Sequence, residues 1–471
     1  MSDVVIGLEV HCQLDTRTKL FCPCSTDYRD DGPNTHVCPV CLGLPGTMPA
    51  VNRAAIEYAL KVAKAFHCAI PEECEFSRKN YFYPDLPKGY QITQYDRPLA
   101  LGGYIEIESE EGGEKRVRLT RIHVEEDPGR LVHKGNTDRG RYSLVDYNRS
   151  GVPLIEIVTE PDMTSPKEAR RLLAQLRATL EYLGVYDSEK EGSLRVDANV
   201  SIRGHERAEV KNISSFKGVE KALTFEITRQ RSLIRRGATI ERETRHFVEA
   251  RGTTTSSRSK VEEHDYRYFP EPDLPPLRVA GWVDAIELPE LPAARPDRFV
   301  SQYGLSANHA RTLTADLRLD AFYEEVAGND PSLAATWVAA TLLGELNYRD
   351  RSIGTVDPAR FRALLALVKA GTITDRSAVE VLRAVLDGDE EPKAVVERLG
   401  LAATQSDDAI ATAIAEAIAE FPQAVADYRA GKANAINYLA GQVMKKTRGR
   451  ADPRELGRLL AEALTEATTC T

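Results

Sequence analysis

The segment Gly7-Leu8-Glu9-Val10-His11-Cys12-Gln13 alternates between apolar and polar residues and decides how the chain is interpreted. Successive side chains of a β-strand point to opposite faces, so Glu9, His11 and Gln13 share one face and the apolar residues share the other. The segment therefore predicts a strand whose apolar face joins a core and whose polar face carries chemically useful side chains.

Three further segments, 123–127, 195–201 and 209–212, repeat this pattern. Their polar positions are His123, Glu125, Asp127, Arg195, Asp197, Asn199, Ser201, Glu209 and Lys211. A solvated outer face is the alternative for any one strand, although such faces favour Lys, Thr and long Glu over His combined with Asp and Asn. The coincidence across four strands predicts a polar saddle that binds Mg²⁺ through carboxylates. Bound Mg²⁺ next to cationic side chains favours phosphoryl transfer.

The hydrophobic pattern divides the whole chain into a strand-rich N-terminal part and a helical C-terminal part. Period-two segments predict strands at 6–14, 104–108, 116–124, 154–158 and 195–202, and helical periodicity predicts helices at 53–66, 165–183 and 216–236. A Pro-rich linker follows at 287–296, and the pattern after it is helical. We expect an α+β chain with a mixed or antiparallel-sheet cradle domain (1–292) that carries a zinc-binding insertion, then a helical domain (293–403) and a helical tail (404–471).

Seven of the eight cysteines lie in the first 74 residues. Cys22-Pro23-Cys24 and Cys38-Pro39-Val40-Cys41 form two close pairs, and each short pair can wrap half of a tetrahedral ion. The spacing predicts a closed, structural zinc site made of Cys22, Cys24, Cys38 and Cys41. Four reduced structural thiols are the alternative, and a disulfide is less expected in a cytoplasmic chain.

The overall composition gives no hint of a nucleic-acid partner. The 471 residues carry 62 Lys plus Arg and 71 Asp plus Glu, a net charge of −9. No apolar run approaches about 18 residues and the N-terminus lacks the features of a signal peptide, so we expect a soluble, cytoplasmic protein without a membrane span.

The local charge of the tail is different from this average. Residues 428–451 contain no acid, and six of them are basic. Such a stretch can contact RNA phosphates, whereas an ordinary charged helix end is the alternative. The candidate RNA-binding residues within it are Lys432, Lys445, Lys446, Arg448 and Arg450.

The sequence contains no familiar nucleotide-binding motif: neither a Walker-type loop nor a Gly-x-Gly-x-x-Gly turn occurs. Basic and aromatic residues interleave in 78–91, and 265–275 partly repeats this mixture. Such mixtures can stack on bases and hold phosphates, but Tyr-rich Pro turns also serve as ordinary loop anchors. The candidate nucleotide- or substrate-binding residues are Arg78, Lys79, Tyr81, Tyr83, Asn199 and Lys211.

Several long motifs together resemble the B-subunit family of glutamyl/aspartyl-tRNA amidotransferases. They are Gly7-Leu8-Glu9-Val10-His11, Arg78-Lys79-Asn80-Tyr81-Phe82-Tyr83-Pro84-Asp85, the run from Val145-Asp146-Tyr147-Asn148-Arg149 to Val158-Thr159-Glu160-Pro161, Asp265-Tyr266-Arg267-Tyr268-Phe269-Pro270-Glu271-Pro272-Asp273, and the tail segment 431–445. The resemblance covers essentially the whole chain. The absence of a large insertion between the helical regions argues against the related archaeal GatE family.

The resemblance implies an ATP-dependent enzyme that phosphorylates the side-chain carboxylate of Glu on tRNA(Gln) or Asp on tRNA(Asn), after which ammonia displaces phosphate. The family's metal ligands match Glu9, His11 and Glu125, which are also the catalytic candidates. Glu126, Asp197 and Glu209 are further candidate Mg²⁺ ligands. The family's zinc-binding members carry cysteines where Cys22, Cys24, Cys38 and Cys41 stand.

The source of ammonia is expected to lie outside this chain. No Gly-Ser-rich amidase pattern occurs, and the family implies two partners, the amidase (glutaminase) GatA and the small protein GatC. The alternative function is a zinc-stabilised tRNA-binding scaffold whose partner carries the chemistry.

Overall fold

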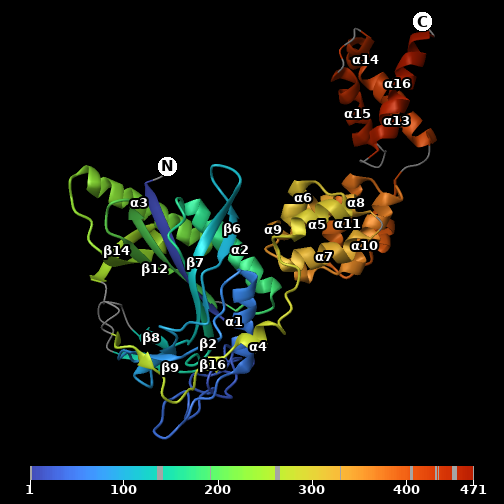
Figure 1. Cartoon of the computed structure of the whole chain (residues 1–471). Helices are drawn as coiled ribbons and strands as arrows, with labels where there is room; N and C mark the ends of the chain where they lie inside the picture. Colours follow the sequence, from blue (N-terminus) through green and yellow to red (C-terminus); the bar gives the residue numbers. More distant parts are fainter. Residues whose placement is uncertain are drawn as a thin grey trace. The chain divides into compact units, whose positions relative to one another are not determined.

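The computed structural model describes residues 3–134, 142–190, 192–259, 266–328, 330–403, 407–429, 432, 434–447 and 453–469. The chain forms two compact units, Met1–Ala294 and Arg295–Thr471, and the boundary lies within the Pro-rich stretch. The first unit holds the strands and the second is helical, so the predicted α+β class, a sheet domain followed by helices, is confirmed (Figure 1).

The strands belong to the first unit. Their bounds are β1 (Val4–Gln13), β2 (Glu73–Cys74), β3 (Ser77–Asn80), β4 (Tyr90–Thr93), β5 (Ala100–Leu101), β6 (Tyr104–Glu108), β7 (Glu114–Glu126), β8 (Arg130–Lys134), β9 (Tyr142–Asp146), β10 (Pro153–Thr159), β11 (Leu194–Ile202), β12 (Ala208–Ile213), β13 (Glu243–Val248), β14 (Thr253–Ser259), β15 (Phe269–Pro270) and β16 (Leu277–Arg278). The main sheet has the order β14-β13-β12-β11-β1-β10-β7-β5, with β6 also paired to β7. Its pairs are antiparallel except β12 with β13, so the sheet is mixed.

Three longer helices of this unit, α1 (Arg53–Ala65), α2 (Pro166–Tyr182) and α3 (Phe216–Arg235), pack against the apolar side of the sheet (Figure 1). Ser165 caps α2 by accepting a hydrogen bond from the Glu168 N–H, and Ser215 caps α3 in the same way through Gly218. Gly237, with φ +71°, follows the end of α3 in the left-handed conformation that glycine adopts readily. A short helix, α4 (Ala280–Val283), completes the unit.

The apolar side of β1 explains why the sheet binds these helices. Val4, Ile6, Leu8, Val10 and Cys12 are all at most 3% exposed and belong to one hydrophobic core. The intervening positions Glu9 and His11 keep partial access to solvent. The predicted two-faced strand is therefore present.

The second unit contains two hydrophobic clusters. Its helices are α5 (Arg295–Tyr303), α6 (Ala307–Leu313), α7 (Leu317–Ala327), α8 (Pro331–Thr336), a π-helical turn at Trp337–Leu342, α9 (Leu343–Tyr348), α10 (Pro358–Lys369), α11 (Asp375–Asp387), α12 (Pro392–Leu399), α13 (Asp407–Glu420), α14 (Pro422–Arg429), α15 (Asn434–Lys446) and α16 (Pro453–Thr469). One cluster runs from Phe299 to Leu401 and the other from Ile410 to Leu464. The tail helices α13–α16 thus have a core of their own.

Candidate functional site

The polar face of the main sheet gathers the candidate residues because the strand register brings them side by side. Glu9 is paired with Asp197, and His11 is paired with both Glu156 and Arg195. On the next strand Glu156 is paired with His123. Side chains from β1, β7, β10 and β11 therefore meet on one face, and β12 adds to them.

His11, His123, Glu125 and Glu156 form what we call the histidine cluster. Glu156 Oε2 lies 3.3 Å from His11 Nε2 and 3.3 Å from His123 Nε2. Glu125 lies 3.9 Å from His11 Nε2 and 3.5 Å from His123 Nε2, and it accepts a 3.0 Å hydrogen bond from the Thr93 hydroxyl. One atom each of His11, Glu125 and Glu156 lies within 4.8 Å of the others, so these three could hold one ion.

The electrostatics of this cluster keep its carboxylates charged. Burial is the largest influence on Glu156 and would raise its pKa, but the charge of His123 and hydrogen bonds with both histidines outweigh burial and hold the pKa well below its usual value. The pKa of Glu125 is lowered against burial by the hydrogen bond to His123. Burial would lower the pKa of His123, yet the two glutamates raise it to about 9. The glutamates are thus available as anionic ligands.

Glu9, Asp197 and Glu209 form a second group, which we call the acidic cluster. One oxygen of each lies within 4.8 Å of the others. Lys211 Nζ lies 2.7 Å from Asp197 and 3.5 Å from Glu209. Burial, together with the charges of Glu156, Glu209 and Asp197, raises the pKa of Glu9. Four like charges thus gather on adjacent strands, an arrangement that a cation would stabilise.

The donors of both clusters fit a hard divalent cation. Carboxylate oxygens and imidazole suit Mg²⁺ or Mn²⁺ better than a thiophilic metal. Asn199 donates a 3.0 Å hydrogen bond to Glu9, and its own Oδ1 is buried with no hydrogen-bond partner among the described residues. This amide oxygen is therefore a further potential ligand beside the acidic cluster.

Two adjoining cavities open over the clusters. One of about 550 Å³ and one of about 810 Å³ share lining residues of both clusters, and they also share Lys79, Tyr81 and Lys211. The larger cavity is lined by tyrosines, among which Tyr95 and Tyr268 stack with ring centroids 4.1 Å apart. The site thus combines clusters of carboxylates and histidines, side-chain cations and flat aromatic surfaces.

Lys79 stands out among the lining residues. Its Nζ lies 4.9 Å from the centre of the Tyr266 ring, and no hydrogen bond or ion pair to it occurs among the described residues. Burial would lower its pKa, but Tyr268 and Glu125 outweigh burial and raise it. A charged ammonium group with unused donors therefore faces both cavities.

Two other predicted substrate-binding residues, Arg78 and Tyr83, lie outside the two cavities or at the edge of the larger one. Arg78 forms a two-pronged ion pair with buried Glu271, with both distances 2.7 Å, and a 3.2 Å contact with Asp273. Arg78 lines neither cavity over the clusters, so the structure gives it a role in holding two distant segments together. Tyr83 is 57% exposed at the edge of the larger cavity.

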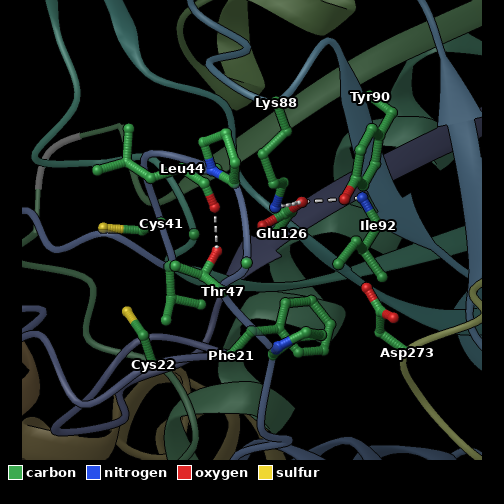
Figure 2. Close-up of a pocket in the computed structure, with 16 residues that line it drawn as sticks. Phe21, Cys22, Cys41, Leu44, Thr47, Lys88, Tyr90, Ile92, Glu126 and Asp273 are labelled. Carbon is green, nitrogen blue, oxygen red and sulfur yellow. Dashed lines mark hydrogen bonds and ion pairs between the residues drawn. The ribbon is translucent and has the colours of Figure 1, made fainter.

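Glu126 does not join either cluster, because adjacent residues of β7 point to opposite faces. It forms an ion pair with Lys88 and accepts a 2.9 Å hydrogen bond from the Ile92 N–H. Lys88 and Glu126 line a separate cavity of about 220 Å³, which Cys22 and Cys41 also line. Figure 2 shows these four side chains. Glu126 therefore belongs to the surroundings of the cysteines rather than to the candidate Mg²⁺ site.

The four predicted zinc ligands are brought together. One Sγ atom from each of Cys22, Cys24, Cys38 and Cys41 lies within 4.8 Å of the others, and all four are free cysteines. Tetrahedral Zn–S bonds of about 2.3 Å require Sγ–Sγ separations of about 3.8 Å. Cys38 and Cys41 have that separation, 3.8 Å. The arrangement fits a structural zinc ion.

Fully buried Lys19 borders these cysteines. Its Nζ lies 3.6 Å from Cys41 Sγ and donates hydrogen bonds to the His36 and Tyr147 carbonyls at 2.8 and 3.3 Å. The hydrogen bond with Cys22 lowers the pKa of Cys41 to about 4, and the charge of Lys19 contributes to this shift. Lys19 thus favours the thiolate that a metal requires.

Glu156, which contacts both His11 and His123, is not among the site residues predicted from the sequence. The alternating pattern of the sequence does indicate it, because Glu156 stands between Ile155 and Ile157 within a segment predicted as a strand. The same alternation that identified Glu9 and His11 places Glu156 on the polar face.

The candidate tRNA-binding residues of the tail are only partly available. Lys432 pairs with Asp427 at 3.0 Å, and Lys446 pairs with Glu416 and Glu420 at 3.1 and 2.9 Å. Lys445 is exposed. Arg448 and Arg450 lie outside the described residues.

Within the described part of the chain, none of the helices combines the length and apolar character that crossing a membrane would require.

Comparison with known proteins agrees with these features. Residues 4–283 match the family model of the GatB/GatE catalytic domain, and residues 321–464 match that of the GatB domain. The chain is 69% identical to the B subunit of the aspartyl/glutamyl-tRNA(Asn/Gln) amidotransferase of Methanoregula boonei, 68% identical to that of Methanospirillum hungatei and 54% identical to that of Methanosarcina mazei; each alignment covers 98% of both chains. The chain therefore belongs to the GatB family of tRNA-dependent amidotransferase B subunits.

Proposed function

We propose that this chain activates the side-chain carboxylate of Glu on tRNA(Gln), of Asp on tRNA(Asn), or of both, by ATP-dependent phosphorylation for subsequent amidation. The observation that carries the proposal is the meeting of the histidine and acidic clusters on one sheet face, under cavities that also expose Lys79 and Lys211. The names of its relatives, which are B subunits of aspartyl/glutamyl-tRNA amidotransferases, support this substrate class.

His11, Glu125 and Glu156 would hold one Mg²⁺, and the acidic cluster with Asn199 would hold another. Bound Mg²⁺ neutralises phosphate charge in such reactions. Glu9, His11 and Glu125 are then the residues nearest to the chemistry. His123 keeps Glu125 and Glu156 oriented through its 3.5 and 3.3 Å contacts.

The reaction requires no protein nucleophile. A carboxylate oxygen of the tRNA-bound amino acid attacks the γ-phosphorus of ATP, the bond to the bridging oxygen breaks, and ADP leaves. Ammonia then attacks the carbonyl carbon and loses a proton, and phosphate departs with the former carboxylate oxygen. Lys79 and Lys211 would bind the anionic oxygens, and Tyr81 and Tyr268 would enclose the reacting groups.

The remaining parts of the chain would assist this reaction. Zinc on the four cysteines would fix the loop that carries Lys19. Ammonia would come from the glutaminase GatA, with the small protein GatC completing the assembly. The tail, through Lys445 and the neighbouring basic residues, would contact tRNA phosphates.

The decisive experiment reconstitutes the full chain with its partner subunits and measures ATP-dependent amidation of each misacylated tRNA. We expect His11→Ala to abolish amidated tRNA while tRNA binding persists, with His67→Ala as a control because His67 lines neither cavity over the clusters. Amidation by His11→Ala at the wild-type rate would instead favour a scaffold whose partner carries the chemistry.

A further inference from the structure

The side chain of Arg195 reaches across the polar face of the main sheet. Arg195 stands on β11, where it is paired with His11 of β1, and its guanidinium donates a 2.7 Å hydrogen bond to Asp127, which directly follows β7. In the order of the sheet, β1 and β10 lie between these two strands. Arg195 thus lines the smaller cavity, of about 550 Å³, whose lining also includes Glu125 and Asp197.

Three carboxylates lie within reach of this guanidinium. Asp127 stands two positions after Glu125, and Asp197 stands two positions after Arg195 itself. Residues two apart along a strand share a face and lie about 7 Å apart. Burial would lower the pKa of Arg195, but Asp127 and then Glu125 and Asp197 raise it. Among the described residues, Arg195 nevertheless forms an ion pair with Asp127 alone.

Asp127 is held rigidly in place. Its side chain is buried, and its backbone N–H donates a 2.9 Å hydrogen bond to the Val152 carbonyl. Its own carbonyl accepts a 2.9 Å hydrogen bond from the Gly151 N–H. The carboxylate oxygen that does not bind Arg195 accepts a 2.6 Å hydrogen bond from the Gln13 side chain. A carboxylate fixed in this way holds the guanidinium of Arg195 at one position.

The two clusters differ in whether a lysine or arginine contacts them. Lys211 Nζ lies 2.7 Å from a carboxylate oxygen of the acidic cluster. In the histidine cluster, Glu125 and Glu156 contact histidines, and no lysine or arginine of the described residues forms an ion pair with either. A guanidinium can bind both oxygens of a carboxylate at once, so an arginine in this cluster would occupy the atoms that a divalent cation needs.

We propose that Asp127 is a positioning residue that holds Arg195 away from Glu125, so that the histidine cluster remains available to a divalent cation. This inference rests on the proposed function, which requires a metal ion at this cluster but does not say what keeps side-chain cations out of it. Arg195 is then a restrained competitor of the metal ion. Asp127 acts through Arg195 and supplies no metal ligand itself.

The test titrates the full-length chain with Mn²⁺ and follows binding by electron paramagnetic resonance. Asp127→Asn keeps the size of the side chain but removes its charge. It should weaken Mn²⁺ binding about 10- to 100-fold, the range expected when a charge-assisted hydrogen bond to Glu125 competes with the metal. Arg195→Gln should bind Mn²⁺ within about twofold of the wild type, and the double variant Asp127→Asn/Arg195→Gln should recover that affinity because the released cation is gone.

Gln13→Met is the matched control. It removes another hydrogen bond to the Asp127 carboxylate but leaves the negative charge in place, so Mn²⁺ binding should stay unchanged. Equal losses in Gln13→Met and Asp127→Asn would assign the effect to packing and overturn the restraint. Wild-type affinity in Asp127→Asn, or a double variant that binds Mn²⁺ as weakly as Asp127→Asn, would overturn it as well.

A second comparison serves if Asp127→Asn does not fold. Asp127→Asn/Arg195→Lys keeps a cation without its partner, whereas Asp127→Asn/Arg195→Gln has none. The variant with lysine should therefore bind Mn²⁺ about tenfold more weakly, and equal affinities would overturn the restraint. A wild-type chain that binds no Mn²⁺ would contradict the metal site of the proposed function itself, and the restraint would fall with it.

Discussion

Glu125 and Glu126 offer a matched pair of substitutions, because they are neighbours in β7 but face different cavities. Glu125→Gln removes an anionic ligand from the histidine cluster while keeping its size. Replacing a residue that only orients a metal ligand lowers metal affinity about 10- to 100-fold. Loss of the ligand charge itself should therefore weaken divalent-metal binding at least 100-fold, or about 2.7 kcal/mol.

Glu126→Gln should lower the stability of the fold and leave metal affinity unchanged. It removes the charged partner of Lys88, which is largely buried, and breaking a buried ion pair costs about 3–5 kcal/mol of stability. The thermal unfolding midpoint should fall, whereas metal affinity should stay unchanged because Glu126 lies outside both clusters.

Titration of the full-length chain with Mn²⁺, followed by electron paramagnetic resonance, measures the metal affinity, and calorimetric unfolding measures stability. We expect Glu125→Gln to lose metal and Glu126→Gln to lose stability. Equal losses of Mn²⁺ binding in the two variants, or a loss confined to Glu126→Gln, would refute the placement of the site on one face of β7.

Three further outcomes follow from contacts outside this pair. Lys19→Met should speed zinc release to a chelator about tenfold or more, measured by a colorimetric indicator, since the thiolates lose a buried counter-charge; unchanged release would remove Lys19 from the zinc site. Gly103→Ala should lower the unfolding midpoint strongly, because an added Cβ would lie 2.4 Å from the Phe66 carbonyl oxygen at φ +91°; an unchanged midpoint would contradict this. Lys445→Ala should weaken tRNA binding and reduce its salt dependence by about one ion, whereas Lys446→Ala, whose partners are glutamates, should do so less; equal effects would contradict that ranking.

Much of the sheet domain could be predicted from local patterns. The helix predicted at 165–183 is found at Pro166–Tyr182, because Ser165 supplies the cap that its residue type suggests. The strand predicted at 104–108 has those bounds. Strand β14 (Thr253–Ser259) was missed, since a run of Thr and Ser lacks the apolar face on which the prediction depends.

The strand face on which each candidate residue lies could be predicted from the sequence, but the side-chain contacts between distant segments could not. Alternation placed Glu9, His11 and Glu125 on polar faces, and applied consistently it would have separated Glu126 from them. The partner of Arg78, Glu271, lies 193 residues away. That contact depends on the pairing of β3 with β15, which no local pattern reveals.

Transfer of a carboxylate oxygen to phosphate would reveal directly whether the carboxylate is phosphorylated. Misacylated tRNA with ¹⁸O at both oxygens of the side-chain carboxylate of its Glu or Asp is amidated by the reconstituted complex with ATP, and the released phosphate is examined by mass spectrometry. Phosphorylation of the carboxylate predicts one ¹⁸O atom in each phosphate released with amidated tRNA. Phosphate free of ¹⁸O, with amidation proceeding normally, would contradict the account.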